Sequence, residues 1–171
     1  MFEINDLPDL ATLNKLAARF PELEISSLDA WLTLMRVAGD GMMALDQFLA
    51  GHDLTQRRFF VLILLFRNPD GLAVSRLAEG TGVSCPTMTG VVEGLLKAGH
   101  VTRDPDPSDR RAFVVRITEQ GKQVLNGVLP GHYSRVRTIM SHLDEDERSD
   151  LKRLLGKVRE GLRKSQEQIS D

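Results

Sequence analysis

The chain has 171 residues, of which 42% are hydrophobic and 27% charged, and a formal net charge of −2, a composition typical of a folded protein. Its longest apolar run, 59–66, is much shorter than the roughly 18 residues of a membrane helix, and the single cysteine, Cys85, excludes an intrachain disulfide. Because the N-terminus also lacks a secretory signal pattern, we expect a cytoplasmic protein with no membrane partner. The length fits one domain or a compact two-lobed unit.

The N-terminal third of the sequence predicts helices. A short helix over 8–19 is followed by a long helix from Ser26. Along the long helix, apolar residues recur every three or four positions in a heptad-like stripe: Leu28, Trp31, Met35, Ala38, Met42, Leu45 and Leu49. An apolar stripe that runs along so much of a helix favours a contact between subunits, although a helix packed in the core of a monomer would show the same pattern. After a break at 51–53, Thr55 caps a helix that runs through Phe66.

The middle of the sequence predicts two helices and then two strands. In chain order these are a turn at 68–71, a short amphipathic helix around 74–79, a glycine-containing turn at 80–82, a helix from Ser84 to about Ala98, and strands at 100–104 and 111–118. Gly99 suits the left-handed residue that ends a helix. The segment between the strands is rich in Pro and Ser and carries Asp109, Arg110 and Arg111 near its tip.

Two further helices are predicted at the C-terminal end. Thr118 caps the first, which Pro130 and Gly131 must kink or interrupt because proline removes an interior hydrogen bond. The second begins at Asp144, and Glu147 completes a capping box. The apolar face of this last helix contains Leu151, Leu154, Leu155, Val158, Leu162 and Ile169.

The order helix, turn, helix, strand, strand indicates a winged helix-turn-helix. Small polar side chains in the first turn of the second helix can approach base edges in a major groove. The hairpin tip can reach the adjacent minor groove, where arginine is the preferred side chain. The charge permits only a local basic patch, since residues 97–116 hold five bases and three acids, a net of +2. Each element alone also fits a structural helical hairpin, but their ordered combination favours DNA binding.

The segment 72–121, LAVSRLAEGTGVSCPTMTGVVEGLLKAGHVTRDPDPSDRRAFVVRITEQG, resembles the MarR family of bacterial transcription factors. Its most specific parts are residues 99–103, where the first strand begins, residues 109–111 at the tip of the wing, and residues 117–121, where the second strand ends. The resemblance covers about residues 26–165. It implies an α+β, mainly α-helical winged helix-turn-helix fold with long N- and C-terminal dimerisation helices. The implied parts of one compact domain are N-terminal dimerisation helices over 1–53, a DNA-binding lobe over 54–118 and C-terminal dimerisation helices over 119–171.

The resemblance also implies a function and a set of DNA-binding residues. The implied function is a homodimeric regulator, usually a repressor, that binds a pseudo-palindromic operator in double-stranded DNA without a cofactor. Carried over position by position, the DNA-binding residues are Ser84, Pro86, Thr87, Thr89, Arg103, Asp109, Arg110 and Arg111. Arg103 would meet the DNA backbone, Arg111 would enter the minor groove, and Asp109 would orient an arginine. Ala73 stands where the family commonly has a Ser or Thr cap.

The resemblance also implies an effector, a small aromatic or phenolic acid. The residues that could line its site between the long helices and the DNA-binding lobe are Trp31, Met35, Arg36, His52 and Phe59. Each of them could equally be plain packing. The extra N-terminal helix and Trp31 resemble a urate-responsive branch, but Phe60 stands where that branch has an acidic residue, which argues against urate.

An enzyme is the alternative class. The four histidines lack the spacing of metal ligands, no glycine-rich phosphate loop is present, and Cys85 has no sequence cue for a base partner. A thiol in the first turn of a helix could also act as an oxidation switch, but a small residue at the DNA surface is the favoured interpretation of Cys85. The sequence therefore predicts a DNA-binding regulator and not an enzyme.

Overall fold

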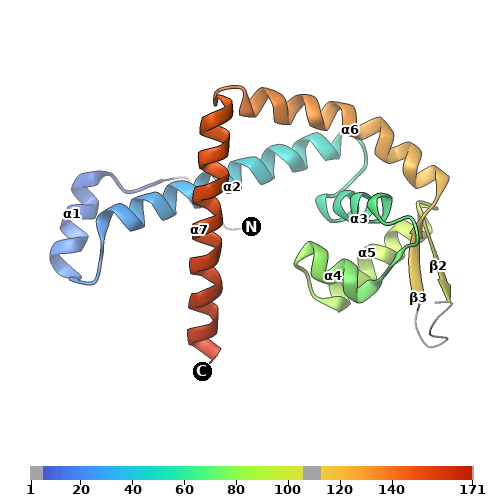
Figure 1. Cartoon of the computed structure of the whole chain (residues 1–171), viewed down its shortest axis with the longest axis horizontal. Helices are drawn as coiled ribbons and strands as arrows, with labels where there is room; N and C mark the ends of the chain where they lie inside the picture. Colours follow the sequence, from blue (N-terminus) through green and yellow to red (C-terminus); the bar gives the residue numbers. More distant parts are fainter. Residues whose placement is uncertain (1–5, 106–112, 171) are drawn as a thin grey trace. The chain divides into compact units, whose positions relative to one another are not determined.

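The computed structural model describes residues 6–105 and 113–170. The chain forms two units, Met1–Leu125 and Asn126–Asp171 (Figure 1). The elements in chain order are α1 (Leu10–Arg19), α2 (Ile25–Ala50), α3 (Gln56–Arg67), β1 (Leu72–Ala73), α4 (Val74–Thr81), α5 (Cys85–Lys97), β2 (Val101–Pro105), β3 (Phe113–Ile117), α6 (Glu119–Met140) and α7 (Glu145–Ser170). The predicted α+β, mainly helical class is confirmed.

Side-chain caps explain where the long helices of the first unit begin. The Glu24 carboxylate accepts hydrogen bonds from the backbone N–H groups of Ser27 at 2.7 Å and Ser26 at 3.1 Å, at the start of α2. Hydrogen bonds from Ser27 and Ser26 lower the pKa of Glu24 to about 2. Thr55 accepts from the N–H of Arg58 at 3.3 Å and caps α3, as predicted. Ala73 supplies no side-chain cap for α4, which was expected from the sequence.

The core of the first unit lies where α3, α4, α5 and the strands meet. Its buried apolar side chains include Phe59, Val61, Leu62, Leu65, Leu77, Met88, Val92, Leu95, Val101 and Val115. Two glycines with a left-handed backbone conformation turn the chain between the elements that supply these core side chains. Gly82 (φ 68°) ends α4, and Gly99 (φ 73°) follows α5 as predicted. The core thereby fixes α5 between the turn after α4 and the hairpin.

Within the described residues the sheet has three antiparallel strands in the order β1-β3-β2. Strand β3 pairs with β2 so that Val101 faces Ile117 and Pro105 faces Phe113. The two-residue β1 pairs Leu72 with Val115 and was not predicted. The hairpin of β2 and β3 directly follows α5 and forms the base of the predicted wing.

The second unit contains most of α6 and all of α7. The predicted capping box of α7 is present: Asp144 accepts from the N–H of Glu147 at 2.8 Å, and Glu147 accepts from the N–H of Asp144 at 2.9 Å. An interruption of α6 at Pro130 was wrong, because α6 is continuous through that residue. Proline removes one hydrogen bond, at a cost of about 3 kcal/mol, while the neighbouring turns keep theirs.

Among the residues that the structure describes, no helix is both long enough and apolar enough to cross a membrane.

Candidate DNA-binding surface and adjoining pocket

The first turn of α5 is held by its own small side chains. Ser84 is the N-cap residue, and its Oγ lies 3.4 Å from the N–H of Thr87 and 2.9 Å from the Thr87 hydroxyl. Pro86 occupies the first turn, where its missing N–H costs nothing. The Thr89 hydroxyl donates to the carbonyl of Cys85 at 3.0 Å. Because these bonds are local, the turn keeps its shape without a bulky side chain on its surface.

Three faces of α5 differ in their surroundings. Met88, Val92 and Leu95 are buried in the core. A second face is exposed and consists of small or polar side chains near the N-terminus: Ser84, Cys85, Pro86, Thr89 and Glu93. A third face, which includes Thr87 and Gly90, lines a pocket. Ser84, Pro86 and Thr89 thus lie on the exposed face predicted to contact DNA, whereas Thr87 is half-buried and lies at the pocket.

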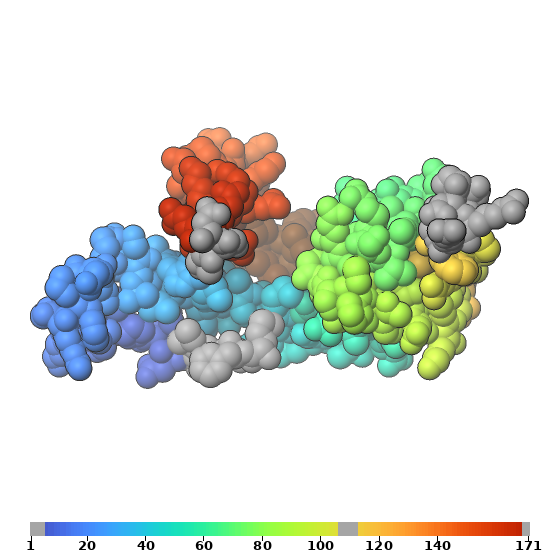
Figure 2. Space-filling model, turned by 90° about the horizontal axis from the view of Figure 1, so that it is seen from below, coloured from blue at the N-terminus to red at the C-terminus, as the bar shows by residue number. Residues whose placement is uncertain are grey.

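The hairpin presents cations beside this helix. Arg103 on β2 is exposed, and its guanidinium carbon lies 4.5 Å from the centre of the Phe113 ring on β3. Arg116 on β3 pairs with Asp104 on β2 at 3.3 Å. In the space-filling view the green to yellow surfaces of α4, α5 and the strands are continuous (Figure 2). The predicted tip residues Asp109, Arg110 and Arg111 lie outside the described residues.

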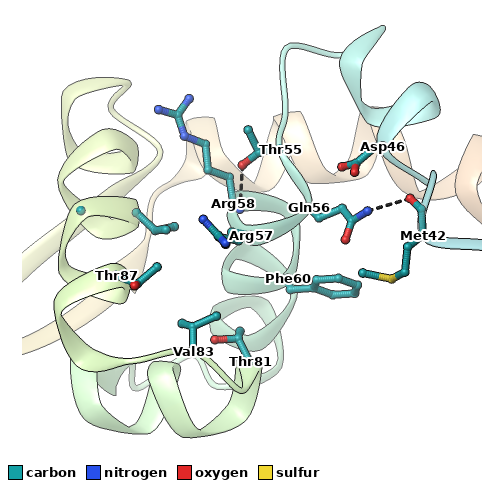
Figure 3. Close-up of a pocket in the computed structure, with 12 residues that line it drawn as sticks. Met42, Asp46, Thr55, Gln56, Arg57, Arg58, Phe60, Thr81, Val83 and Thr87 are labelled. Atoms are coloured by element: carbon teal, nitrogen blue, oxygen red, sulfur yellow. Dashed lines mark hydrogen bonds between the residues drawn. The ribbon is translucent and has the colours of Figure 1, made fainter. Parts of the chain in front are cut away.

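A pocket of about 810 Å³ lies on the other side of α5, between α5, α3 and α2 (Figure 3). Its lining residues are Met42 and Asp46 of α2, Thr55, Gln56, Arg57, Arg58 and Phe60 around the start of α3, Thr81 and Val83 at the end of α4, and Thr87, Gly90 and Val91 of α5. The Gln56 amide donates to the carbonyl of Met42 at 2.7 Å and joins α3 to α2. The pocket therefore touches both the long helix and the helix that carries the exposed polar face.

Two arginines dominate the charge of this pocket. Within the described part of the chain, neither the Arg57 nor the Arg58 guanidinium makes a hydrogen bond or an ion pair with another side chain. The Arg58 guanidinium lies against the backbone of α5, since a Cβ atom added to Gly94 would lie 2.6 Å from its Nη2 atom. Gly94 thus leaves room for the arginine, and the pocket holds two cations that an anion could engage.

None of the five predicted effector residues lines this pocket. Trp31 and Met35 are exposed on α2, at 40% and 49%, N-terminal to the part of the helix that lines the pocket. Arg36 bonds to Asp40 on the same helix at 3.2 Å, and the His52 ring packs edge-on against Phe48. Phe59 is fully buried because it points into the core of the lobe.

The pocket residues Gln56, Arg57 and Arg58 were missed by sequence reasoning. Their signal was a polar first turn on the otherwise apolar helix QRRFFVLILLFR. Among the described residues, no group of three or more His, Cys, Asp or Glu side chains is placed to hold a metal ion.

Comparison with known proteins agrees with this geometry. The model of the MarR family matches residues 54–113, from the turn before α3 to the start of β3. The chain is 29% identical over 161 residues to the transcriptional repressor YetL of Bacillus subtilis, covering 94% of this chain and 96% of YetL. It is 30% identical over 144 residues to the transcriptional regulator PecS of Dickeya dadantii, covering 83% of this chain and 87% of PecS. Both relatives are transcriptional regulators.

Solved structures show the same fold. The transcriptional repressor CouR bound to a 23-mer DNA duplex matches with a TM-score of 0.70 at 26% identity, covering 81% of this chain and 99% of that one. CouR from Rhodococcus jostii RHA1 bound to p-coumaroyl-CoA matches with a TM-score of 0.69 at 24% identity, covering 77% and 92%. The winged helix-turn-helix is thereby confirmed. With PecS matched over most of its length, this chain belongs to the MarR family of DNA-binding transcriptional regulators.

Proposed function

We propose that the protein is a homodimeric repressor that binds a pseudo-palindromic operator and is released by a small aromatic acid. The observation that carries this proposal is the exposed polar face of α5, with the hairpin cations beside it. Ser84, Pro86 and Thr89 are small enough for the helix to approach base edges, and hydroxyl groups can donate or accept there. Arg103 of the hairpin would contact the DNA backbone, and Arg111, with Arg110 and Asp109 beside it, would enter the minor groove.

Homodimer formation is supported by apolar surface on α7. Leu151, Leu154, Leu155, Val158 and Leu162 are each 38–50% exposed and follow one side of the helix. A second apolar surface that covers such a stripe removes it from water. Most homodimers have two-fold symmetry, in which the same surface of both copies meets. The partner that we propose is a second copy of this chain.

The dimer is tested by light scattering of two matched variants. Leu155→Asp places a charge on the stripe, whereas Ser149→Asp adds the same charge on the opposite, polar side of α7. We expect the mass of a dimer for the wild type and for Ser149→Asp, and a large monomer fraction for Leu155→Asp. A wild-type monomer at micromolar concentration would contradict the proposal.

The pocket supports the proposed effector class. Two guanidiniums can bind a carboxylate, Phe60 and Met42 offer an apolar surface for a ring, and Asp46 on α2 can accept a hydrogen bond from a phenolic hydroxyl (Figure 3). The ligand of CouR, p-coumaroyl-CoA, has a phenolic ring but, as a thioester, no carboxylate on its acyl group; it supports the ring and hydroxyl of the proposed effector only. We therefore assign the effector site to Arg57 and Arg58 and not to the five residues predicted from the sequence.

Operator binding is tested by fluorescence anisotropy with DNA from upstream of the protein's own gene, against shuffled DNA of equal length. We expect the upstream DNA to bind at least tenfold more tightly. Inserting 5 base pairs between the half-sites should abolish this preference, and inserting a full turn should restore part of it, because a two-fold dimer reads half-sites on one side of the helix. Equal binding to both DNAs would contradict the proposed function.

The effector site is tested with 4-hydroxycinnamate and its neutral amide. The acid should raise the melting temperature and release the operator, and the amide should do neither. Arg57→Gln with Arg58→Gln should abolish the response, whereas Arg67→Gln, at the far end of α3 and outside the pocket, should keep it. If the amide acts as well as the acid, the arginines do not select the ligand.

A further inference from the structure

The charged side chains of the β2–β3 hairpin lie on two different faces. Successive residues of a strand point to opposite faces, so Arg103 and Asp104 cannot lie on the same side of β2. Asp104 lies on the face of Arg116, whose guanidinium donates to its carboxylate at 3.3 Å, and the Thr102 hydroxyl donates to the same oxygen at 3.1 Å. The nearest carboxylate along the chain is therefore engaged away from Arg103.

On the opposite face, Arg103 meets an aromatic ring. The register pairs Arg103 with Val115 and Pro105 with Phe113, so Arg103 and Phe113 are diagonal neighbours on one face of the hairpin, within reach of long side chains. The guanidinium carbon lies 4.5 Å from the centre of the Phe113 ring, inside the range of a cation–π interaction. Within the described part of the chain, the Arg103 guanidinium makes no hydrogen bond or ion pair.

Packing in the core does not account for the ring. Phe113 is 43% exposed, whereas the next residues of β3, Val114 and Val115, are 8% and 0% exposed. What the ring adds is a flat surface that restricts the rotamers of Arg103.

We propose that Phe113 is a positioning residue for DNA binding, which holds the Arg103 guanidinium in place before DNA arrives. An arginine that is already ordered loses less side-chain entropy when it binds a phosphate. A ring leaves the full positive charge of Arg103 available, whereas a carboxylate in its place would neutralise that charge. This inference rests on the proposed contact of Arg103 with the DNA backbone.

The test is a double-mutant cycle on operator binding, measured at several salt concentrations. Phe113→Leu keeps an apolar side chain on the strand and removes the ring. A cation–π contact of the usual strength at an exposed site corresponds to about a 2- to 5-fold effect per wing, hence about 4- to 25-fold for the two wings of a dimer. The slope of log affinity against log salt should not change in Phe113→Leu, because the cation remains. In Arg103→Gln the slope should flatten by up to about 1.8, that is about 0.9 for each of two phosphates.

Phe113→Tyr should restore wild-type affinity, and Phe113→Trp should bind at least as tightly, because Trp offers the best ring for a cation. In the Arg103→Gln background, Phe113→Leu should have no further effect. An equal reduction of affinity in both backgrounds would overturn the inference, because Phe113 would then act without Arg103. An unchanged salt slope in Arg103→Gln would instead show that Arg103 does not contact the DNA backbone. The proposal that α5 binds the operator would not be affected by that result.

Discussion

Gly121, near the start of α6, allows a test of how tightly α6 packs against His100 and Ile117 in the DNA-binding lobe. A Cβ atom added to Gly121 would lie 2.2 Å from the carbonyl oxygen of His100 and 2.9 Å from Cγ1 of Ile117. The His100 oxygen cannot simply move aside, because it accepts a hydrogen bond from the N–H of Thr118 at 3.0 Å. The Thr118 hydroxyl in turn bonds to the carbonyl of Gly99 at 2.7 Å and to the N–H of Gly121 at 3.0 Å.

Gly121→Ala should therefore destabilise the protein. Overpacking a tight site costs typically about 1–3 kcal/mol, and the contact with a fixed backbone atom places Gly121→Ala in the upper part of that range. Replacing glycine by alanine inside a helix by itself stabilises the helix by about 0.5–1 kcal/mol. We expect a net decrease of about 1–2 kcal/mol in the free energy of unfolding.

The matched control is Gly127→Ala, also in α6. Gly127 is exposed and has no atom within 4 Å of the added Cβ, so this variant should be more stable than the wild type by about 0.5–1 kcal/mol. Urea unfolding followed by circular dichroism, at one fixed protein concentration because of the proposed dimer, measures both variants. If Gly121→Ala is as stable as Gly127→Ala, the His100 carbonyl does not exclude a side chain and the reasoning fails.

Two further predictions concern the start of α2 and the surface of α5. Since hydrogen bonds from Ser27 and Ser26 lower the pKa of Glu24 from 4.5 to about 2, its stabilising effect is full above pH 4.5 and disappears as the pH falls toward 2. The urea midpoint of Glu24→Gln should therefore lie below that of the wild type at pH 6 and approach it at pH 3; an equal gap at both pH values would show that the carboxylate charge is not responsible. Thr89→Ala should weaken operator binding, by about 1–3 kcal/mol if its hydroxyl bonds well to a base, much more than binding to random DNA. Thr87→Ala, at the pocket, should change this ratio less, and anisotropy titrations that find the reverse order would reassign the two faces of α5.

Local signals made most of the secondary structure predictable. The helix starts at Thr55 and Asp144 depend on side chains within three residues, which the sequence displays directly. Strand β1 was missed because its two residues form a strand only through pairing with β3, more than 40 positions later. The sequence left two outcomes open at Pro130, a kink or an interruption, and α6 is not interrupted, because the continuity of a helix depends on all the hydrogen bonds around the proline and not on the missing one alone.

The exposed face of α5 was predictable because small polar residues at helical spacing mark it. Which neighbour covers each remaining face is a tertiary property, and there the sequence was insufficient. Thr87 was expected on the DNA side, but α3 and α2 lie near it and form a pocket wall with it. The two arginines of that wall belong to a polar first turn, which by itself indicates only the solvated start of a helix.

The proposed operator surface and the proposed effector pocket meet on different faces of one short helix, α5. Thr87 and Gly90 line the pocket, while Ser84 and Thr89, within one turn of Thr87, are exposed toward the proposed DNA surface. The hydroxyls of Ser84 and Thr87 lie 2.9 Å apart, so a ligand that engages Thr87 competes for a bond that helps to cap α5. A ligand can weaken operator binding only as far as its affinities for the DNA-bound and free forms differ, and the operator must weaken ligand binding by the same factor. Because the pocket wall and the DNA surface share a helix of 13 residues, this coupling needs no longer path than the first turns of α5.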